Sequence, residues 1–372
     1  MNSKMLDALI ALLNKSNEKT LSETEWRDLI LVSRASGVLA RVAHCLAEDV
    51  RSKLNSKIYR HFEAAKRHET LFHNQVKNEI EVIRKGVLNS KSYKVALLKG
   101  AGYVFSQSGA SKGRIFSDID ILVQKNNLAD FEQSLNLLGW VSRSDNYDDT
   151  YYRQWAHEIP PMIHINRSSV IDVHHNIVPI VSGRAPNAEL LWDETKTIDD
   201  GVQVLSTSAM FVHSAIHLFF KEEFYFGFRD LTDLMCLFIE MKNSESDIER
   251  VKTLASKLGF ELEVYLALRY LKLILKVDEV DDALQHFVDI QPSKFKLLCY
   301  DWMYRRVLIP RHSLTMKKFT GLASSLAFLR GHLLKMPLHI FIKHITVKTL
   351  NGMLKKITGN NTGFFKQKVK EQ

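Results

Sequence analysis

The chain has 372 residues, 45% of them hydrophobic and 25% charged, a composition that is typical of globular proteins and excludes wholesale disorder. Its net charge of +9 comes from 51 Lys and Arg against 42 Asp and Glu, but residues 303–370 contain 14 basic and no acidic residues. The rest of the chain has 37 basic and 42 acidic residues, a net charge of −5, so a basic partner surface is expected only in the last fifth.

The cysteines and the apolar stretches indicate a cytoplasmic protein. The three cysteines form no C-x-x-C pair and no even set, which favours a reducing compartment. The N-terminus predicts an amphipathic helix and not a signal peptide, because Asp7 interrupts its apolar run. The longest apolar stretches, at 322–334 and 338–347, are shorter than the ~20 residues of a membrane-spanning helix. We therefore expect a soluble protein that at most contacts a membrane from outside.

Residues 1–90 have a helical pattern. Ser22 and Glu25 form an S-x-x-E capping box ahead of an apolar run, which predicts that a helix begins there. Residues 52–87 carry apolar side chains three and four positions apart, and no glycine or proline interrupts residues 38–85. This pattern predicts one long helix with a solvated face.

The pattern changes at Tyr93, where short β-type runs begin. Helices are predicted from Gly100 and over residues 127–138, and helices return from Ser206 onward. We expect an α+β fold in which a small mixed sheet is flanked by helical regions. The predicted strands are 95–98, 118–123, 162–165, 170–175 and 202–205. The predicted regions are 1–90 (helical), 91–205 (α/β core), 206–312 (helical) and 313–372 (basic amphipathic tail).

The strand DIDILV contains the first candidate for chemistry. Side chains two positions apart share one face of a strand, so Asp118 and Asp120 project together from an otherwise apolar segment. A divalent cation would explain two adjacent carboxylates there, because Mg²⁺ binds through one or two carboxylates, water and phosphate oxygens. The alternative is a strand end that faces solvent, which is the commoner setting of a bare D-x-D pair.

Neighbouring residues favour the metal hypothesis. Lys99 and Gly100 end an apolar run and begin a helix, a geometry in which backbone N–H groups bind phosphate. Arg114 follows in a glycine-containing segment, where its guanidinium could bind a phosphate with two hydrogen bonds. The strand VIDVHH places Asp172 on one face with His174, and a hairpin would bring it beside the D-x-D strand. Three convergent carboxylates suit phosphoryl or nucleotidyl transfer.

At this point the sequence resembles a known family. L-K-G, R-x-F-S-D-I-D-I-L-V, D-V-H-H, H-x-x-x-H and F-R-D-L-x-D-L follow in an order similar to the uncharacterised nucleotidyltransferase family of bacteria, within the DNA polymerase β-like superfamily. The resemblance covers residues 90–240 well. It implies that Asp118 and Asp120 are paired ligands of Mg²⁺ or Mn²⁺, Asp172 the third catalytic carboxylate, and Lys99-Gly100 the turn that faces the triphosphate. The superfamily's usual Gly-Ser turn is absent, which puts the strength of nucleotide binding in doubt.

Other polar residues leave alternatives open. We include Ser117, His174 and Arg229 among the candidate nucleotide-binding residues, with His174 orienting Asp172 or a phosphate. Arg229 belongs to a polar cluster that either forms a buried salt-bridge network or lines the nucleotide cleft. A zinc site in which His164 meets His174 across the hairpin is a further alternative, although no zinc motif supports it. The polar cluster that contains Arg229 comprises His213, His217, Arg229, Asp230 and Asp233. The other two histidines close in sequence to His164 and His174 are His157 and His175.

The leading hypothesis is a metal-dependent nucleotidyltransferase that moves an NMP from an NTP to an unidentified acceptor hydroxyl or phosphate. The alternative is a catalytically silent module of the same fold that acts through its helices and basic tail. The two hypotheses differ in whether all three carboxylates converge. The tail, residues 313–372, alternates lysines with apolar residues, which is typical of a helix that binds an anionic membrane surface, nucleic acid, or the protein's own core.

Overall fold

The computed structural model describes residues 3–16, 21–91, 93–144, 146–199, 201–342 and 346. Within these ranges, seven strands form one mixed sheet in the order β3-β4-β5-β2-β1-β7-β6. The strands are β1 Val95–Leu97, β2 Asp118–Val123, β3 Trp140–Ser142, β4 Met162–His164, β5 Val170–His174, β6 Thr195–Asp199 and β7 Val202–Leu205. The predicted α+β class, with a small mixed sheet between helical regions, is confirmed.

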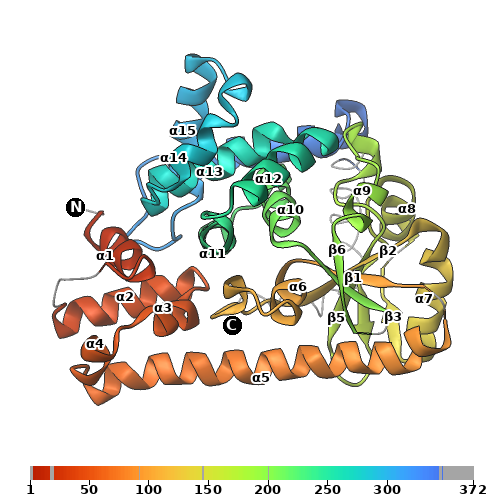
Figure 1. Ribbon diagram of the computed structural model, residues 1–372, viewed down its shortest axis with the longest axis horizontal. Helices are drawn as coiled ribbons and strands as arrows, with labels where there is room; N and C mark the ends of the chain where they lie inside the picture. The colour runs from red at the N-terminus through yellow and green to blue at the C-terminus, as the bar shows by residue number, and fades with distance from the viewer. Residues whose placement is uncertain are drawn as a thin grey trace.

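The N-terminal helices form one end of the molecule. The Ser22 hydroxyl accepts a hydrogen bond from the Glu25 backbone N–H, and the Glu25 carboxylate accepts one from the Ser22 N–H at 2.8 Å, so the capping box is present. The predicted long helix is a single helix, α5, which runs from the other N-terminal helices to the sheet (Figure 1). The helices are α1 Ser3–Leu13, α2 Glu23–Ala35, α3 Leu39–Cys45, α4 Glu48–Ser52 and α5 Ser56–Gly86.

Four helices accompany the sheet, and two of them were predicted. They are α6 Lys99–Phe105, α7 Leu128–Leu137, α8 Asn146–Trp155 and α9 Glu189–Trp192. Sequence reasoning did not predict α8, α9, β3 or β6. β3 has only three residues, and β6 is an edge strand whose side chains are mostly exposed, so neither has the apolar alternation that reveals a half-buried strand.

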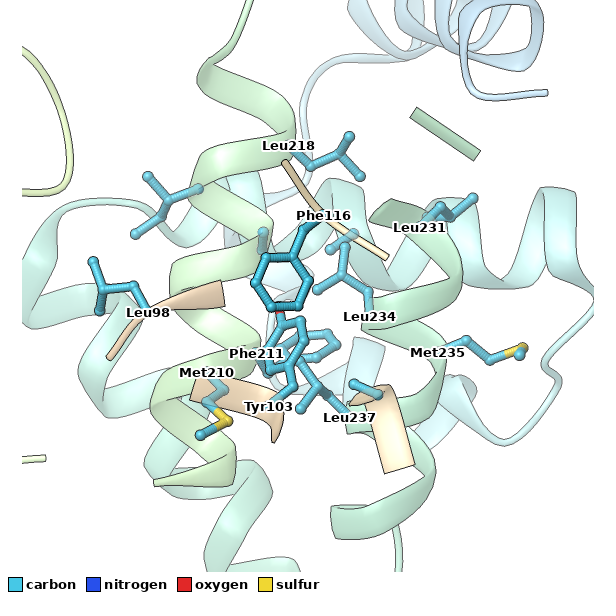
Figure 2. Close-up of a cluster of buried hydrophobic side chains, with 14 of the residues drawn as sticks. Leu98, Tyr103, Phe116, Met210, Phe211, Leu218, Leu231, Leu234, Met235 and Leu237 are labelled. Atoms are coloured by element: carbon cyan, nitrogen blue, oxygen red, sulfur yellow. The ribbon is translucent and has the colours of Figure 1, made fainter. Parts of the chain in front are cut away.

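The C-terminal helices pack on the sheet through α10. They are α10 Thr207–Phe220, α11 Gly227–Met241, α12 Glu245–Leu258, α13 Glu261–Leu275, α14 Val280–Gln285, α15 Lys294–Val307 and α16 Thr320–Lys335. Figure 2 shows the junction, where Tyr103 of α6, Phe211 of α10 and Leu234 of α11 meet in one buried cluster. Burial of such side chains stabilises the fold by about 1.5–3 kcal/mol each. None of the described helices is long and apolar enough to cross a membrane.

The predicted division into four regions stays a prediction. One continuous cluster of buried apolar side chains extends from Met5 in α1 to Ala327 in α16. Of the basic amphipathic tail predicted at 313–372, the structure describes residues 313–342 and 346, which include α16; the helical form of the remaining residues lies outside the described part of the chain and stays a prediction.

Candidate active site

The strand register brings three carboxylates together. β2 and β5 are parallel neighbours, and Asp120 lies directly opposite Asp172. Asp118 is two residues before Asp120 and therefore shares its face of the sheet. One ligand oxygen of each residue lies within 4.8 Å of the others. The opposite face, including Ile119 and Ile121, packs in the apolar core, so a one-residue slip of the register would turn the carboxylates into that core.

Asp120 is the most enclosed of the three and already has two partners. Lys99 Nζ donates a hydrogen bond to Asp120 Oδ1 at 2.7 Å, and His174 Nε2 lies 2.9 Å from the same oxygen. Burial opposes ionisation of Asp120, but the Lys99 charge and the His174 contact outweigh it and hold the pKa of Asp120 below its usual range. The charges of Asp120 and Asp118 likewise raise the pKa of Lys99 despite its burial. Asp120 is therefore held ionised.

The turn that delivers Lys99 has two unusual features. Lys99 has a φ of +43°, a region that costs a residue with a Cβ about 1–2 kcal/mol. At Gly100, an added Cβ would lie 2.4 Å from the ring of Phe116, so a larger residue would displace that ring. The Leu98 N–H donates to the Asp120 backbone carbonyl at 3.0 Å, which fixes the turn against β2. The positions of Lys99 and Gly100 follow from this close packing.

Asp172 differs from Asp120 because no described residue donates a hydrogen bond to its Oδ1 atom, which is buried. Burial, and then the neighbouring charges of Glu158, Asp118 and Asp120, raise the pKa of Asp172 well above its usual range. A buried acceptor without a partner, next to further carboxylates, fits a divalent cation, because a bound cation would satisfy that oxygen and offset the repulsion.

Glu158 and His157 belong to the site, although sequence reasoning did not select Glu158. Ile159 N–H donates to the Val173 carbonyl at 3.0 Å and His175 N–H to the His157 carbonyl at 2.8 Å, so this segment pairs with the end of β5. Glu158 Oε2 then lies 3.3 Å from His174 Nδ1. The dipeptide His157-Glu158, between α8 and β4, matches no metal-binding or catalytic motif in the sequence. Only its pairing with β5 shows that it lies beside His174.

Ser117, Arg114 and Arg229 lie at different places around the carboxylates. Ser117 Oγ donates to Asp118 Oδ1 at 2.9 Å and is exposed, so it is available to a ligand. Arg114 is buried, and its Nε atom pairs with Asp233 Oδ2 at 2.8 Å. Arg229 pairs with Asp230 at 3.3 Å and donates to the Ile115 carbonyl. The nucleotide-binding roles of all three stay predictions.

Arg114 and Arg229 join one buried ion-pair cluster. Asp230 pairs with Lys221, with Arg229, and with Arg114 at 3.5 Å. Asp233 pairs with Arg114 and with Arg41, the latter at 2.7 Å. The salt-bridge network that the sequence left open is therefore present, and it contains four cations and two carboxylates. We call it the cationic cluster and define it as Arg41, Arg114, Lys221, Arg229, Asp230 and Asp233.

Two histidines of α10 connect the cationic cluster with the carboxylates. Burial and the positive charge of Lys99 lower the pKa of His213 to about 3. Burial and the charges of Lys99 and Lys221 lower the pKa of His217 well below its usual range. The positive charge of Lys99 acts on both histidines, and that of Lys221 acts on His217, so the imidazoles of α10 are neutral.

The zinc hypothesis in which His164 meets His174 is wrong. His164 pairs with Trp140 of β3, and its backbone N–H donates to the Ser169 carbonyl at 2.9 Å. Its side chain contacts the Leu138 carbonyl at 3.2 Å and accepts from two backbone N–H groups in the hairpin. His164 therefore stabilises the hairpin turn, and the histidine beside His174 is His157, at a ring distance of 5.3 Å.

The arrangement suits chemistry on a phosphate ester. It combines a carboxylate triad that fits a divalent cation, a lysine beside it, and a second, positively charged cluster. A family model described as "Uncharacterised nucleotidyltransferase" matches residues 22–276. No curated protein and no solved structure matches the chain significantly.

Proposed function

The chain belongs to the uncharacterised nucleotidyltransferase family, and from this premise we propose that it moves a nucleoside monophosphate from an NTP to an acceptor hydroxyl or phosphate, with pyrophosphate as the other product. The observation that carries the proposal is the convergence of Asp118, Asp120 and Asp172 from two adjacent parallel strands. Mg²⁺ or Mn²⁺ bound by these carboxylates would neutralise charge on the transferring phosphate.

The three carboxylates have different roles in this proposal. Asp118 and Asp120 hold the cation, and Lys99 and His174 keep Asp120 ionised and oriented for it. Asp172, whose Oδ1 atom accepts no hydrogen bond from the described residues, would complete the carboxylate ligands of the cation and help to orient the acceptor hydroxyl for attack. Most of the rate enhancement would come from positioning and charge neutralisation.

The cationic cluster is the proposed site for the triphosphate. With two more positive than negative charges, it is electrostatically incomplete without an anion. Burial lowers the pKa of Lys221 and of Arg229 although the carboxylate of Asp230 acts in the opposite direction, which supports a deficit of negative charge at this place. A triphosphate would supply the missing negative charge and pair with the guanidinium of Arg229 and the ammonium of Lys221.

The alternative is a catalytically silent module with the same fold. This alternative predicts that Asp172 and Asp118 lie on opposite faces of the sheet. The observed register, with Asp120 opposite Asp172, supports the enzyme instead. Lys99 and His174 contact Asp120 without a metal ion, and these contacts are compatible with either hypothesis. The experiment that separates the hypotheses must therefore measure nucleotide binding and turnover.

The decisive experiment removes the paired metal ligands. We expect the double variant Asp118→Asn, Asp120→Asn to lose Mg²⁺-dependent NTP binding in calorimetry and to lose transfer of label from an α-labelled NTP to acceptors in a cell extract. The matched control is Asp281→Asn, Asp282→Asn, which removes two adjacent carboxylates from the exposed start of α14. Binding and transfer that survive in the first variant at the level of the control would contradict the assignment.

We further propose that the C-terminal region binds an anionic membrane surface from the cytoplasmic side. α16 packs small residues, Ala323, Ala327 and Gly331, against the protein. It turns a row of leucines to solvent, each 44–54% exposed, at a spacing that keeps them on one face. We call this row, Leu322, Leu326, Leu329 and Leu333, the leucine face. Residues 313–372 contain no acidic residue before Glu371, so the region combines apolar and basic character.

A further inference from the structure

A second group of metal-ligating side chains adjoins the carboxylate triad. His157, Glu158 and His174 each offer a ligand atom within 4.8 Å of the others. Glu158 Oε2 lies 3.3 Å from His174 Nδ1 and 4.0 Å from His157 Nε2. Ligands at about 2.0–2.1 Å from a tetrahedral ion are roughly 3.4 Å apart. Of the three distances between ligand atoms, the one from Glu158 to His174 already has this length, and the other two lie within 4.8 Å and must shorten when an ion binds.

The imidazole of His174 has one nitrogen available to a metal ion. Its side chain is 4% exposed, and its Nδ1 atom makes no hydrogen bond with the described residues, although Glu158 Oε2 lies 3.3 Å away. The other ring nitrogen, Nε2, lies 2.9 Å from Asp120 Oδ1. This is how metal-binding histidines are held, with one nitrogen on the metal and the other donating its proton to a carboxylate. His157 is the less constrained ligand, and the Nε2 atom of its ring is the nitrogen that lies beside Glu158.

The backbone around these residues is fixed by the sheet. His157, Glu158 and Ile159 run antiparallel to the end of β5, with Glu158 opposite His174. Three backbone hydrogen bonds of 2.8–3.1 Å join the segment to residues 173–176. The ligands therefore lie on two paired extended segments, and little conformational entropy is lost when they bind an ion.

We propose that His157, Glu158 and His174 bind a transition-metal ion of the zinc class at a site separate from the Asp118, Asp120, Asp172 triad. Two imidazoles and one carboxylate suit Zn²⁺ or Co²⁺, whereas Mg²⁺ prefers oxygen ligands. Three protein ligands leave a fourth position for water or a substrate atom. An ion on Nδ1 also keeps the His174 proton on Nε2, where it donates to Asp120, so the metal acts as a positioning element for the triad. The site does not depend on nucleotidyl transfer.

The test is metal binding by the full chain after removal of metals with a chelator. We expect about one Zn²⁺ per chain by calorimetry, and visible d–d absorption when Co²⁺ replaces it. His157→Gln and Glu158→Gln should each weaken Zn²⁺ binding by at least about 10–100-fold, the effect of losing even an outer partner of a zinc ligand. The matched control is His175→Gln, because His175 is a buried neighbour outside the group. Circular dichroism checks that each variant is folded. If one of the two ligand variants does not fold, the other alone tests the proposal.

Competition with Mg²⁺ separates the two sites. Zn²⁺ binding should persist in a large excess of Mg²⁺ and in the Asp118→Asn variant. Equal Zn²⁺ affinity in the parent, His157→Gln and Glu158→Gln proteins would overturn the proposal. So would displacement of Zn²⁺ by Mg²⁺ together with loss of binding in Asp118→Asn, which would place the ion at the carboxylate triad.

Discussion

Lys99 combines an unfavourable backbone conformation with a central chemical position. Its φ of +43° is normally left to glycine, yet the residue is a lysine whose ammonium lies 2.7 Å from Asp120. Conformations of this kind persist where surrounding packing imposes them, and they gather at functional sites. Two contacts impose the conformation here: Gly100 packs against the ring of Phe116, and the Leu98 N–H donates a hydrogen bond to the Asp120 backbone carbonyl. The charge at this position is therefore kept at a conformational cost.

Two substitutions of Lys99 separate these effects. Lys99→Gly and Lys99→Ala both remove the ammonium, but only glycine adopts positive φ without strain. We expect the glycine variant to have a free energy of unfolding about 1 kcal/mol higher than the alanine variant, measured by urea denaturation. Both should weaken Mg²⁺-NTP binding to a similar extent in calorimetry. An alanine variant as stable as the glycine variant would show that the turn is not strained.

His213 makes the stability of the protein depend on pH. Burial and the charge of Lys99 lower its pKa from 6.5 to about 3 in the folded protein. Between these pH values the unfolded chain binds a proton that the folded protein does not, so stability is lost as the pH falls below 6.5. The loss from this one group approaches about 1.4 kcal/mol for each pH unit.

His213→Gln should flatten this dependence. Between pH 6.5 and pH 5 we expect the free energy of unfolding to fall less steeply in the variant than in the parent. The difference in slope should correspond to at most one bound proton, about 1.4 kcal/mol per pH unit. Urea denaturation at a series of pH values measures it. His68→Gln, at an exposed position of α5, controls for loss of an imidazole. Parallel curves for parent and His213→Gln would contradict the role of His213.

At the level of elements, Asp233 joins three parts of the chain. It lies on α11 and pairs with Arg41 of α3 and with Arg114 of the segment before β2. All three side chains are less than a tenth exposed. Removing one partner of a buried ion pair is strongly destabilising, because the other charge stays buried without compensation. Asp233 therefore fixes the N-terminal helices and the sheet relative to α11.

Asp233→Ala should lower the free energy of unfolding by about 3–5 kcal/mol in urea denaturation, because it removes the carboxylate that pairs with Arg41 in the interior and leaves Arg114 only its 3.5 Å pair with Asp230. Glu279→Ala provides the comparison, since it removes a carboxylate from the exposed pair with Lys242. An exposed pair contributes at most about 1 kcal/mol. A loss in Asp233→Ala no larger than that of the control would show that the network does not hold these elements together.

At the scale of the whole molecule, charge and apolar surface are concentrated in the same region. The leucine face of α16 is exposed, and residues 303–370 contain 14 basic and no acidic residues. Lysines and arginines near an anionic membrane contribute about 1 kcal/mol each, and apolar side chains add the energy of burial in the interface. The body, with its net charge of −5, supplies no comparable attraction.

Co-sedimentation with lipid vesicles tests this arrangement. The full chain should bind vesicles that contain phosphatidylserine, bind neutral vesicles less, and be released by salt. Leu326→Ser should weaken binding several-fold, whereas Leu71→Ser, which changes an isolated exposed leucine of α5, should not. Salt-sensitive binding to RNA or DNA without vesicle binding would identify nucleic acid as the partner instead.

The sequence by itself determined the features that depend on residues close together in the chain. The capping box of Ser22 and Glu25, the length of α5, and the shared face of Asp118 and Asp120 follow from periodicity within a few residues. The apolar pattern of β2 and β5 was strong enough to predict both strands. β3 and β6, which are short or mostly exposed, lacked that pattern.

Only the tertiary structure decided which distant residues meet. The sheet order places Asp172 opposite Asp120, and an irregular segment pairs with β5 and brings His157 and Glu158 to His174. Packing of α11 places Asp233 against Arg114, a residue predicted from its neighbours alone to bind phosphate. Strand pairing and helix packing join residues far apart in the chain, and no local spacing specifies such contacts, because they arise from burial of the core as a whole.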